Sequence, residues 1–493
     1  MRPFKLKTMK KFGYIIILAL VMTSGVSCKK FLTVNPKTEM PQDVLFSTES
    51  GFKDALTGVY IQLKGSSVYG RALSYSTIEY LVSSWDTDAG SWQKKIGEFD
   101  YNDETVQNNL SSIFGAEYKV IASLNAILDK IDQQKSVFTT PGMYEMIKSE
   151  CLALRAYCHL DLIRLFGPIP TDPSNGNELA YVKQLSNQPN DHISYEAYKA
   201  ALMQDLKDAA ALSENVDPIL TYSLSELRNL GVGKAFNPTD DYVGYRYLRM
   251  NYYAIKALEA RANLWYGDKD QAYGAAKEVI DATNEDGTPK FRLGQSSDFA
   301  DKDYSLIPEQ IFGLYDFDMF DTYTNNFASG SFKKSTSATV INTQLYGNTG
   351  TDIRETSLWN VITLSNQAKC YVIRKYEVVE SPTSLNADFK QIPMLRISEM
   401  YLIAAETAPA GAAQQYWDSF RLSRNLDQTA LPDDQTLKTQ AILKEYRKEF
   451  YAEGQAFFAY KRVNAPKSDV IFAPTTVQEM NYLIPMPKNE SVN

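Results

Sequence analysis

Apolar residues repeat at helical spacing along several long stretches of the chain. The clearest stretch runs from residue 147 to 165, where one apolar stripe recurs every three or four positions: Ile147, Cys151, Leu154, Cys158, Leu162 and Leu165. This spacing places the stripe on one face of an α-helix. A second stripe covers much of the remaining surface, so we predict a helix that is buried on most sides. The sequence FGPIP at 166–170 ends it, because proline cannot continue a helix.

The same periodicity predicts further helices at 50–63, 106–131 and 195–212. Residues 251–282 indicate two helices around a Gly267-Asp268 turn, and alanines at 260, 272 and 276 would let the two pack closely. This pair is similar to part of a tetratricopeptide repeat. A last helical block is expected from 394 to 462, with breaks near Pro409 and Pro432.

Three long polar stretches with few clear periods separate the helical blocks, at 166–194, 213–247 and 284–393. Loops of this length are uncommon in compact domains unless they have a function. A few short strands are expected within 310–380, for example at 369–379. The pattern therefore predicts a mainly α fold: a tetratricopeptide-like helical-pair scaffold with large irregular loop insertions and a few short strands. The scaffold is expected mainly at 40–165, 195–212, 248–283 and 394–462.

The first 28 residues have the order of a bacterial lipoprotein signal. Five basic residues within 2–11 precede an apolar run at 12–22, which is too short to span a bilayer. Small or modest residues at 23–27 then lead directly to Cys28. We predict that residues 1–27 are removed as a signal peptide and that Cys28 carries several acyl chains, which would anchor the protein stably. The alternative is an ordinary secretory signal with an incidental cysteine.

The charge balance is acidic. The chain has 51 Lys and Arg against 59 Asp and Glu, and without the signal peptide the basic count falls to 46, for a formal charge of −13. This argues against nucleic acid and anionic lipid surfaces as partners. Cys151 and Cys158 lie seven apart on the predicted helix, about 10 Å, which is too far for a disulfide. Both are expected to be buried apolar side chains, and Cys370 is the third cysteine that remains after the signal peptide.

Enzymatic chemistry has little support, and we predict a protein that is not an enzyme and has no catalytic residue. There are two histidines, and His159 lies inside the predicted helix, where a structural role is expected. Glu399 and Glu406 lie seven apart on one helix, and Arg396 is spaced to pair with Glu399, so both carboxylates are interpreted as scaffold residues. No cofactor is expected. The acidic pairs at 86/88 and 316/318 are incomplete fragments of a calcium loop, and a structural calcium ion stays an alternative.

Aromatic and polar residues gather in two hydrophilic segments, SSWDTDAGSWQ (83–93) and YDFDMFDTYTNN (315–326). A sugar needs aromatic platforms for its C–H faces and fixed polar groups for its hydroxyls. We predict that one wall of a shallow sugar site is formed by Trp85, Asp86, Asp88, Trp92, Tyr101 and Asn102. A second wall is predicted from Tyr315, Phe317, Asp318, Tyr323 and Trp359. The alternative is that these aromatics attach the loops to the scaffold or face a partner.

Six segments resemble the SusD/RagB family of outer-membrane nutrient-binding lipoproteins, and they occur in the family's order. They are CKKFLTVNP (28–36), LRAYCHLDLIRLFGPIP (154–170), ALEARANLWYGDKDQAYGAAKEVI (257–280), MLRISEMYLIAAET (394–407), ILKEYRKEFYAEGQAFFAYKR (442–462) and YLIPMPKNE (482–490). The resemblance implies one SusD-like domain at 28–493, built on four tetratricopeptide-like helix pairs.

The resemblance also implies a function. It implies a lipid-anchored protein of the outer membrane that faces the exterior, binds an oligosaccharide without chemistry, and sits as a lid on a SusC-like TonB-dependent transporter. Two alternatives stay open: a peptide-binding lid of the same kind of importer, and a tetratricopeptide-like adaptor whose grooves hold a protein partner. The aromatic loops favour sugar binding over the adaptor.

Overall fold

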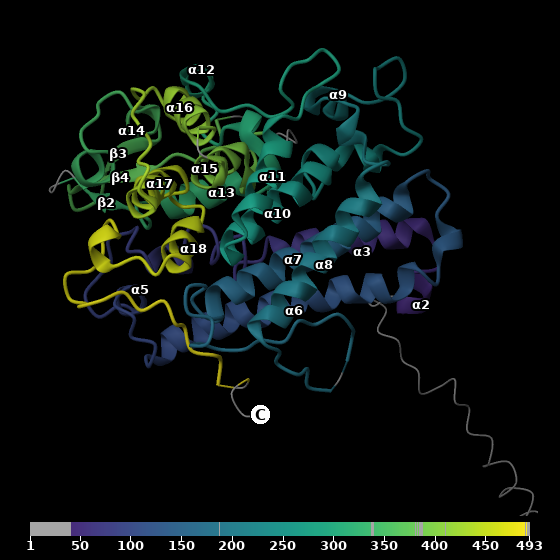
Figure 1. Ribbon diagram of the computed structural model, residues 1–493, viewed down its shortest axis with the longest axis horizontal. Helices are drawn as coiled ribbons and strands as arrows, with labels where there is room; N and C mark the ends of the chain where they lie inside the picture. The colour runs from purple at the N-terminus through teal and green to yellow at the C-terminus, as the bar shows by residue number, and fades with distance from the viewer. Residues whose placement is uncertain are drawn as a thin grey trace, which may run out of the picture.

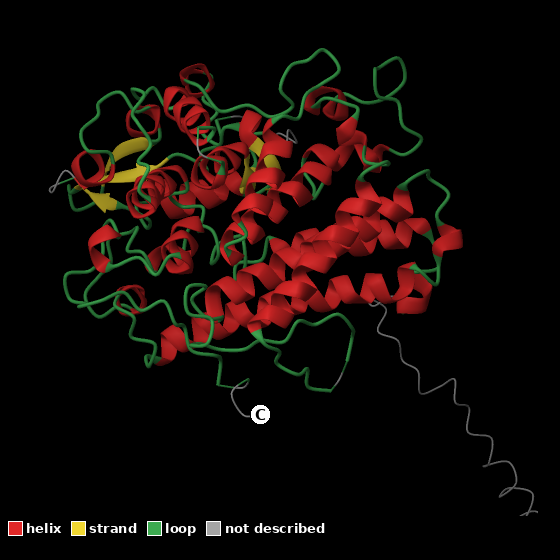
Figure 2. Cartoon of the chain, in the orientation of Figure 1, coloured by secondary structure: helices red, strands yellow, loops and turns green. Residues whose placement is uncertain are grey.

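The computed structural model describes residues 41–490 except 187, 337–339, 380, 382, 384–387, 410 and 489. The predicted signal peptide and Cys28 therefore lie outside the described residues. Helices dominate the described part (Figure 2). The main helices are α2 (Gln42–Leu45), α3 (Glu49–Leu63), α4 (Thr77–Tyr80), α5 (Trp92–Gly97), α6 (Glu104–Ile131), α7 (Met143–Phe166), α8 (Tyr195–Ser213), α9 (Leu224–Arg228), α10 (Tyr252–Tyr266), α11 (Lys269–Ile280), α12 (Ser296–Ala300), α13 (Met319–Tyr323), α14 (Ile353–Ser357), α15 (Ile397–Thr407), α16 (Ala413–Ser423), α17 (Gln435–Glu449) and α18 (Gln455–Arg462). The strands are β1 (Gln310–Tyr315), β2 (Lys334–Ser335), β3 (Trp359–Thr363), β4 (Lys369–Ile373) and β5 (Gln391–Arg396).

The long helices stack largely in chain order. α3 packs on α6, α6 on α7, α7 on α8, α8 on α10, α10 on α11, α11 on α15 and α15 on α16. Stacking of each helix on its neighbours is the arrangement of helical-repeat proteins. The predicted fold class, a tetratricopeptide-like helical scaffold with a few short strands, is therefore confirmed. Within the described residues, no helix combines the length and the apolar character that crossing a bilayer requires.

Helix α7 is buried along almost its whole length, as its two apolar stripes predict. Its C-terminal end is held by Lys461 of α18, whose Nζ donates to the carbonyl oxygens of Leu165 and Gly167 at 2.9 and 2.8 Å. These carbonyls have no partner within the helix. Burial lowers the pKa of Lys461 to about 7. A single side chain thus joins the last helix of the scaffold to its central one.

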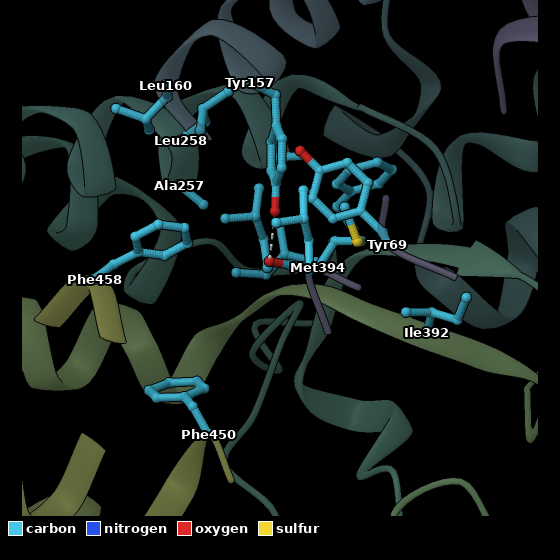
Figure 3. Packing of buried hydrophobic residues seen from close by; sticks show 14 of the residues in the cluster. Tyr69, Tyr157, Leu160, Ala257, Leu258, Ile392, Met394, Phe450 and Phe458 are labelled. Carbon is cyan, nitrogen blue, oxygen red and sulfur yellow. Dashed lines mark hydrogen bonds between the residues drawn. The ribbon is translucent and has the colours of Figure 1, made fainter. Parts of the chain in front are cut away.

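Residues from four elements meet in the core beside α7. Tyr157 of α7, Leu258 of α10, Met394 of β5 and Phe458 of α18 are all buried there (Figure 3). The Tyr157 hydroxyl donates to the carbonyl oxygen of Met394 at 3.4 Å. Helical and strand elements therefore share one continuous core.

The predicted helical block at 394–462 is wrong at two points. Residues 391–396 form strand β5, which pairs antiparallel with β1, and helix α15 begins only at Ile397. The partner strand explains this, because β1 comes from residues 310–315, which no local pattern at 391–396 reveals. Pro393 is tolerated in such an edge strand. The block also breaks between α17 and α18, where Gly454 has a φ of +73°. This left-handed conformation suits glycine.

The stretches predicted as irregular insertions hold the short helices α9, α12, α13 and α14 and strands β1–β4. Strand β4 lies within the strand predicted at 369–379. It is the centre of a three-stranded sheet in the order β2-β4-β3, antiparallel throughout. This sheet lies at the opposite end of the molecule from α2 (Figure 1).

A buried cluster of charges attaches this end of the molecule to the helices. Glu449 of α17 accepts from Arg354, Arg396 and Arg424, at 3.1, 2.8 and 2.7 Å respectively. Burial alone would raise the pKa of Glu449, but Arg424 and Arg396 lower it well below its ordinary value. Since removing one partner of a buried ion pair leaves an uncompensated charge, the cluster fixes the place of α14 and of strand β3 directly after it.

Candidate functional site

Trp85 is buried, so the prediction that it offers an exposed platform is wrong. Its side chain is 2% exposed, and its Nε1 donates to the carbonyl oxygen of Tyr75 at 2.8 Å. Its ring contacts Phe327, Phe332 and Tyr451, with centroids 6.0, 5.5 and 5.2 Å away. The residues that bury Trp85 lie far away in the sequence. Its sequence neighbours are polar and therefore gave no indication of this burial. Trp85 supports the loops from beneath.

Tyr101 is also an interior residue, contrary to the prediction. It is 7% exposed, and its hydroxyl donates to the carbonyl oxygen of Asn481 at 2.9 Å. Asn102 and Asp88, by contrast, are exposed. Trp92 is half-buried at the start of α5, where its ring meets Tyr80 edge-on at 5.6 Å. Of the first predicted wall, the two Asp residues, Trp92 and Asn102 therefore remain accessible.

Asp86 joins its loop to the edge of the sheet. Its backbone N–H donates to the carbonyl oxygen of Lys333 at 2.9 Å, and its carboxylate accepts from the backbone N–H of Ser335 at 2.6 Å. The same carboxylate lies 3.2 Å from Nζ of Lys334. Asp86 is still exposed. It therefore closes the outer edge of β2 and keeps part of its carboxylate in solvent.

Trp359 lies on a partly exposed face of the sheet. The register pairs Trp359 with Ile373, and Val361 with Tyr371, so these four side chains share one face. Val361 is 47% exposed, whereas Trp359 and Tyr371 are half-buried with their rings 6.4 Å apart. Nε1 of Trp359 donates to the Tyr346 hydroxyl at 3.2 Å. The result is a small aromatic surface with fixed ring positions.

Tyr371 was not among the predicted site residues. Its hydroxyl donates to Oδ1 of Asn342 at 2.7 Å, which fixes the ring beside Trp359. The signal that could have found it is the predicted strand at 369–379. In a strand, side chains at alternate positions share a face, so Lys369, Tyr371 and Ile373 point the same way. The partner strand that brings Trp359 to that face was not recognisable from the sequence.

The second predicted wall divides between two environments. Tyr323 stacks on Phe327 at 6.0 Å, and Phe327 contacts Trp85, so Tyr323 joins the aromatic cluster of the first wall. Phe317 is 41% exposed, with Nζ of Lys390 4.3 Å above its ring. Tyr315 is half-buried and Asp318 exposed. The structure thus joins the two predicted segments through Phe327, which neither prediction included.

A shallow hollow of about 450 Å³ adjoins the sheet. It is lined by residues 328–331, by Lys333 and by residues 362–366 of the β3–β4 turn. Most of these positions carry hydroxyl, amide or amino groups, whereas Ile362 and Leu364 are apolar. Ile362 pairs with Cys370 on the opposite face of the sheet from Trp359, Val361 and Tyr371, so the hollow is not continuous with the aromatic surface.

Comparison with known proteins identifies the family. Residues 30–217 match a family described as starch-binding and associating with the outer membrane, and residues 315–485 match the SusD family. The chain belongs to the SusD/RagB family. The two matches include both predicted walls, the sheet and helices α15–α18.

Two curated relatives of the SusD/RagB chain are SusD-like proteins of Formosa agariphila. They are 26% and 23% identical over 33% and 39% of this chain. The matched regions cover 32% and 37% of those proteins, about a third of their length.

Solved structures of the family share the fold. A SusD superfamily protein of Bacteroides vulgatus has a TM-score of 0.67 at 19% identity, over 90% of this chain and 96% of that one. One of Bacteroides thetaiotaomicron has a TM-score of 0.65 at 19% identity, over 90% and 97%. A structure described as a SusD-like carbohydrate binding protein of Bacteroides vulgatus has a TM-score of 0.63 at 17% identity, over 85% and 84%.

The residues considered for catalysis have structural roles in this SusD/RagB protein. His159 accepts from the backbone N–H of Val182 at 3.1 Å and lies 2.9 Å from the Tyr198 hydroxyl, and burial lowers its pKa to about 3. Glu399 and Glu406 are buried and paired with Arg261 and Arg462, each at 2.7 Å.

The cysteines and the possible metal ligands can also be assessed in the structure. Cys151 and Cys158 are free and buried, as predicted, and Cys370 is free and buried as well. The described residues include no group of three or more His, Cys, Asp or Glu arranged to hold a metal ion.

Proposed function

We propose that this SusD/RagB protein binds a glycan at the surface of the outer membrane and delivers it to a SusC-like TonB-dependent transporter. The proposal includes a lipid anchor at Cys28 and an orientation toward the exterior. It is supported by the matched family's description as starch-binding and associating with the outer membrane. A structural neighbour described as a carbohydrate-binding protein also supports it.

One observation carries the choice of site: Trp359, Val361 and Tyr371 share a partly exposed sheet face beside Asp86. An aromatic contact contributes about 0.5–1.5 kcal/mol beyond the buried area. Asp86, whose carboxylate is partly in solvent, would accept hydrogen bonds from sugar hydroxyls. The other accessible residues of the two predicted walls stay further candidate contacts: Trp92, Asp88, Asn102, Tyr315, Phe317, Asp318 and Tyr323. We expect a dissociation constant between about a micromolar and a millimolar.

The test is calorimetry on full-length protein in detergent, with a panel of oligosaccharides. Tyr371→Ala and Trp359→Ala should each weaken binding at least tenfold, or about 1.4 kcal/mol. Val361→Lys places a charged side chain at an exposed position of the same face and should also weaken binding. Because this position is exposed, the variant can test the face even if the aromatic variants are unstable. Tyr144→Ala at the far end of α7 is the matched control for loss of a half-buried tyrosine.

The outcomes separate sugar binding from the alternatives. Unchanged affinity in Tyr371→Ala, Trp359→Ala and Val361→Lys would exclude this face as the site. Binding of peptides but of no glycan would replace the ligand class. Co-purification of a β-barrel transporter with the wild-type protein from the membrane tests the partner, and its absence would contradict the delivery step.

A further inference from the structure

A second hollow, larger than the one beside the sheet, lies against helix α6. Its volume is about 880 Å³, within the range of about 300–1,000 Å³ that small-molecule sites occupy. One side is the face of α6 that carries Phe114, Gly115, Tyr118 and Ala122. The other side is the loop between α7 and α8, and Glu490 also lines the hollow. We call this hollow the α6 groove.

The loop is fixed at its base, where hydrogen bonds join its two ends and hold one of them against α6. Ile193 donates its backbone N–H to the carbonyl oxygen of Leu179 at 3.1 Å, so the two ends of the loop meet. The Tyr118 hydroxyl donates to the carbonyl oxygen of Ala180 at 2.9 Å, and Asn125 donates to that of Val182 at 3.0 Å. Beyond these anchors, residues 184–186 and 189–192 line the side of the groove that faces α6.

Small residues keep the groove open on the helix side. Gly115 is exposed in the middle of α6, and a Cβ placed there would meet no heavy atom within 4 Å. Ala122, two turns further along, also lines the groove. Between them Tyr118 is half-buried, with its ring 4.8 Å from that of Phe114. Tyr118 is therefore the accessible ring of the pair, whereas Phe114 is buried beside it.

The border of the groove has acceptors and donors that suit a sugar. Gln184, Asn190, Asp191, His192 and Glu490 line it and are exposed. The described lining residues include two carboxylates and no lysine or arginine. An anionic ligand would be repelled by this arrangement, whereas carboxylates and amides readily accept hydrogen bonds from hydroxyl groups.

We propose that the α6 groove is a second binding site for a neutral oligosaccharide, with Tyr118 as its stacking platform. The class of ligand rests on the proposed function of the protein, whereas the location of the site rests on the geometry of the groove. Two sites for one polymeric ligand would raise the apparent affinity without new contacts at either one.

The experiment uses full-length protein in detergent and neutral hexasaccharides as probes: maltohexaose, cellohexaose, laminarihexaose and xylohexaose. An oligogalacturonate and hexa-lysine serve as acidic and basic probes. Ala122→Trp should fill the groove and weaken its binding at least tenfold. Asn108→Trp, at an exposed position of α6 outside the groove, is the matched control. Melting temperatures show whether each variant is folded, and Tyr118→Leu is a second test that removes the platform.

The comparison with Trp359→Ala separates the two sites. The proposal is supported if a neutral hexasaccharide still binds Trp359→Ala and this residual binding disappears when Ala122→Trp is added. Loss of all binding in Trp359→Ala, with none lost in Ala122→Trp or Tyr118→Leu, would overturn the groove and leave the proposed function intact. Binding that only Ala122→Trp abolishes would support the groove and exclude the sheet. The groove proposal would also be overturned if the protein binds no neutral probe, or if the groove binds only the acidic or the basic probe.

Discussion

Arg261 of α10 and Glu399 of α15 form a buried two-point ion pair, although 138 residues separate them in the sequence. Nε and Nη2 of Arg261 donate to the two carboxylate oxygens at 2.9 and 2.7 Å. The prediction that Arg396 pairs with Glu399 is therefore wrong. Arg396 ends strand β5 and points to Glu309, Glu449 and Glu453 instead. The helix spacing that would bring the two together is interrupted by the strand.

This pair should behave as a buried charge pair when one partner is removed. Arg261→Met leaves Glu399 buried without a cation and should lower the free energy of unfolding by about 3–5 kcal/mol. Adding Glu399→Leu removes the stranded charge and should restore part of that loss. Urea denaturation of both variants measures the difference. Lys277→Met is the control, since Lys277 and its partner Asp281 are 46% and 54% exposed, and the loss should be about 0–1 kcal/mol.

Glu117 should make the stability of the protein fall as the pH rises. It is 1% exposed on α6, and burial, together with the negative charge of Asp161, raises its pKa to about 8. The ordinary pKa is 4.5. The full stability is therefore present below pH 4.5 and is lost progressively as the pH rises toward 8, because the unfolded chain ionises first. With about 1.36 kcal/mol per pKa unit, the loss should be on the order of a few kcal/mol.

Glu117→Gln isolates this effect, because the amide cannot ionise. The free energy of unfolding of the variant, relative to the wild type, should increase between pH 5 and pH 8 and change little at higher pH. Glu104→Gln, at an exposed position of the same helix, should show no such trend. A Glu117→Gln difference that is constant with pH would mean that this carboxyl does not titrate abnormally.

The sequence was sufficient for the helices and insufficient for the site, and the aromatic residues show why. Leu154 lies on a stripe that repeats within one helix, so its burial is a local property of the sequence. The burial of Trp85 depends on Phe327, Phe332 and Tyr451, which the chain brings together from distant segments. The polar residues next to Trp85 in the sequence do not indicate that distant aromatic residues bury it. Trp359 was predicted, but its partner Tyr371 follows only from the strand register.

Lipidation is tested independently of the ligand. Cys28→Ala removes the only thiol that could receive the acyl chains after the apolar run at 12–22. We expect the variant to lose incorporation of a labelled fatty acid and to leave the membrane fraction, since stable anchoring needs more than one chain. Cys370→Ala is the control, because that thiol is buried. Undiminished label on Cys28→Ala would contradict the signal assignment.

Trp85 and Trp92 should differ in what their removal changes. Trp85 is enclosed by aromatic rings, so Trp85→Ala leaves a cavity and should lower the free energy of unfolding by about 3–5 kcal/mol. Trp92 is only half-buried and meets Tyr80 through one edge, so Trp92→Ala should cost less stability. If Trp92 contacts the glycan as proposed, its removal should also weaken binding in the folded protein. Chemical denaturation and calorimetry on the same samples separate the two effects. A small loss of stability in Trp85→Ala, together with a large loss of affinity, would mean that Trp85 becomes accessible to the ligand after all.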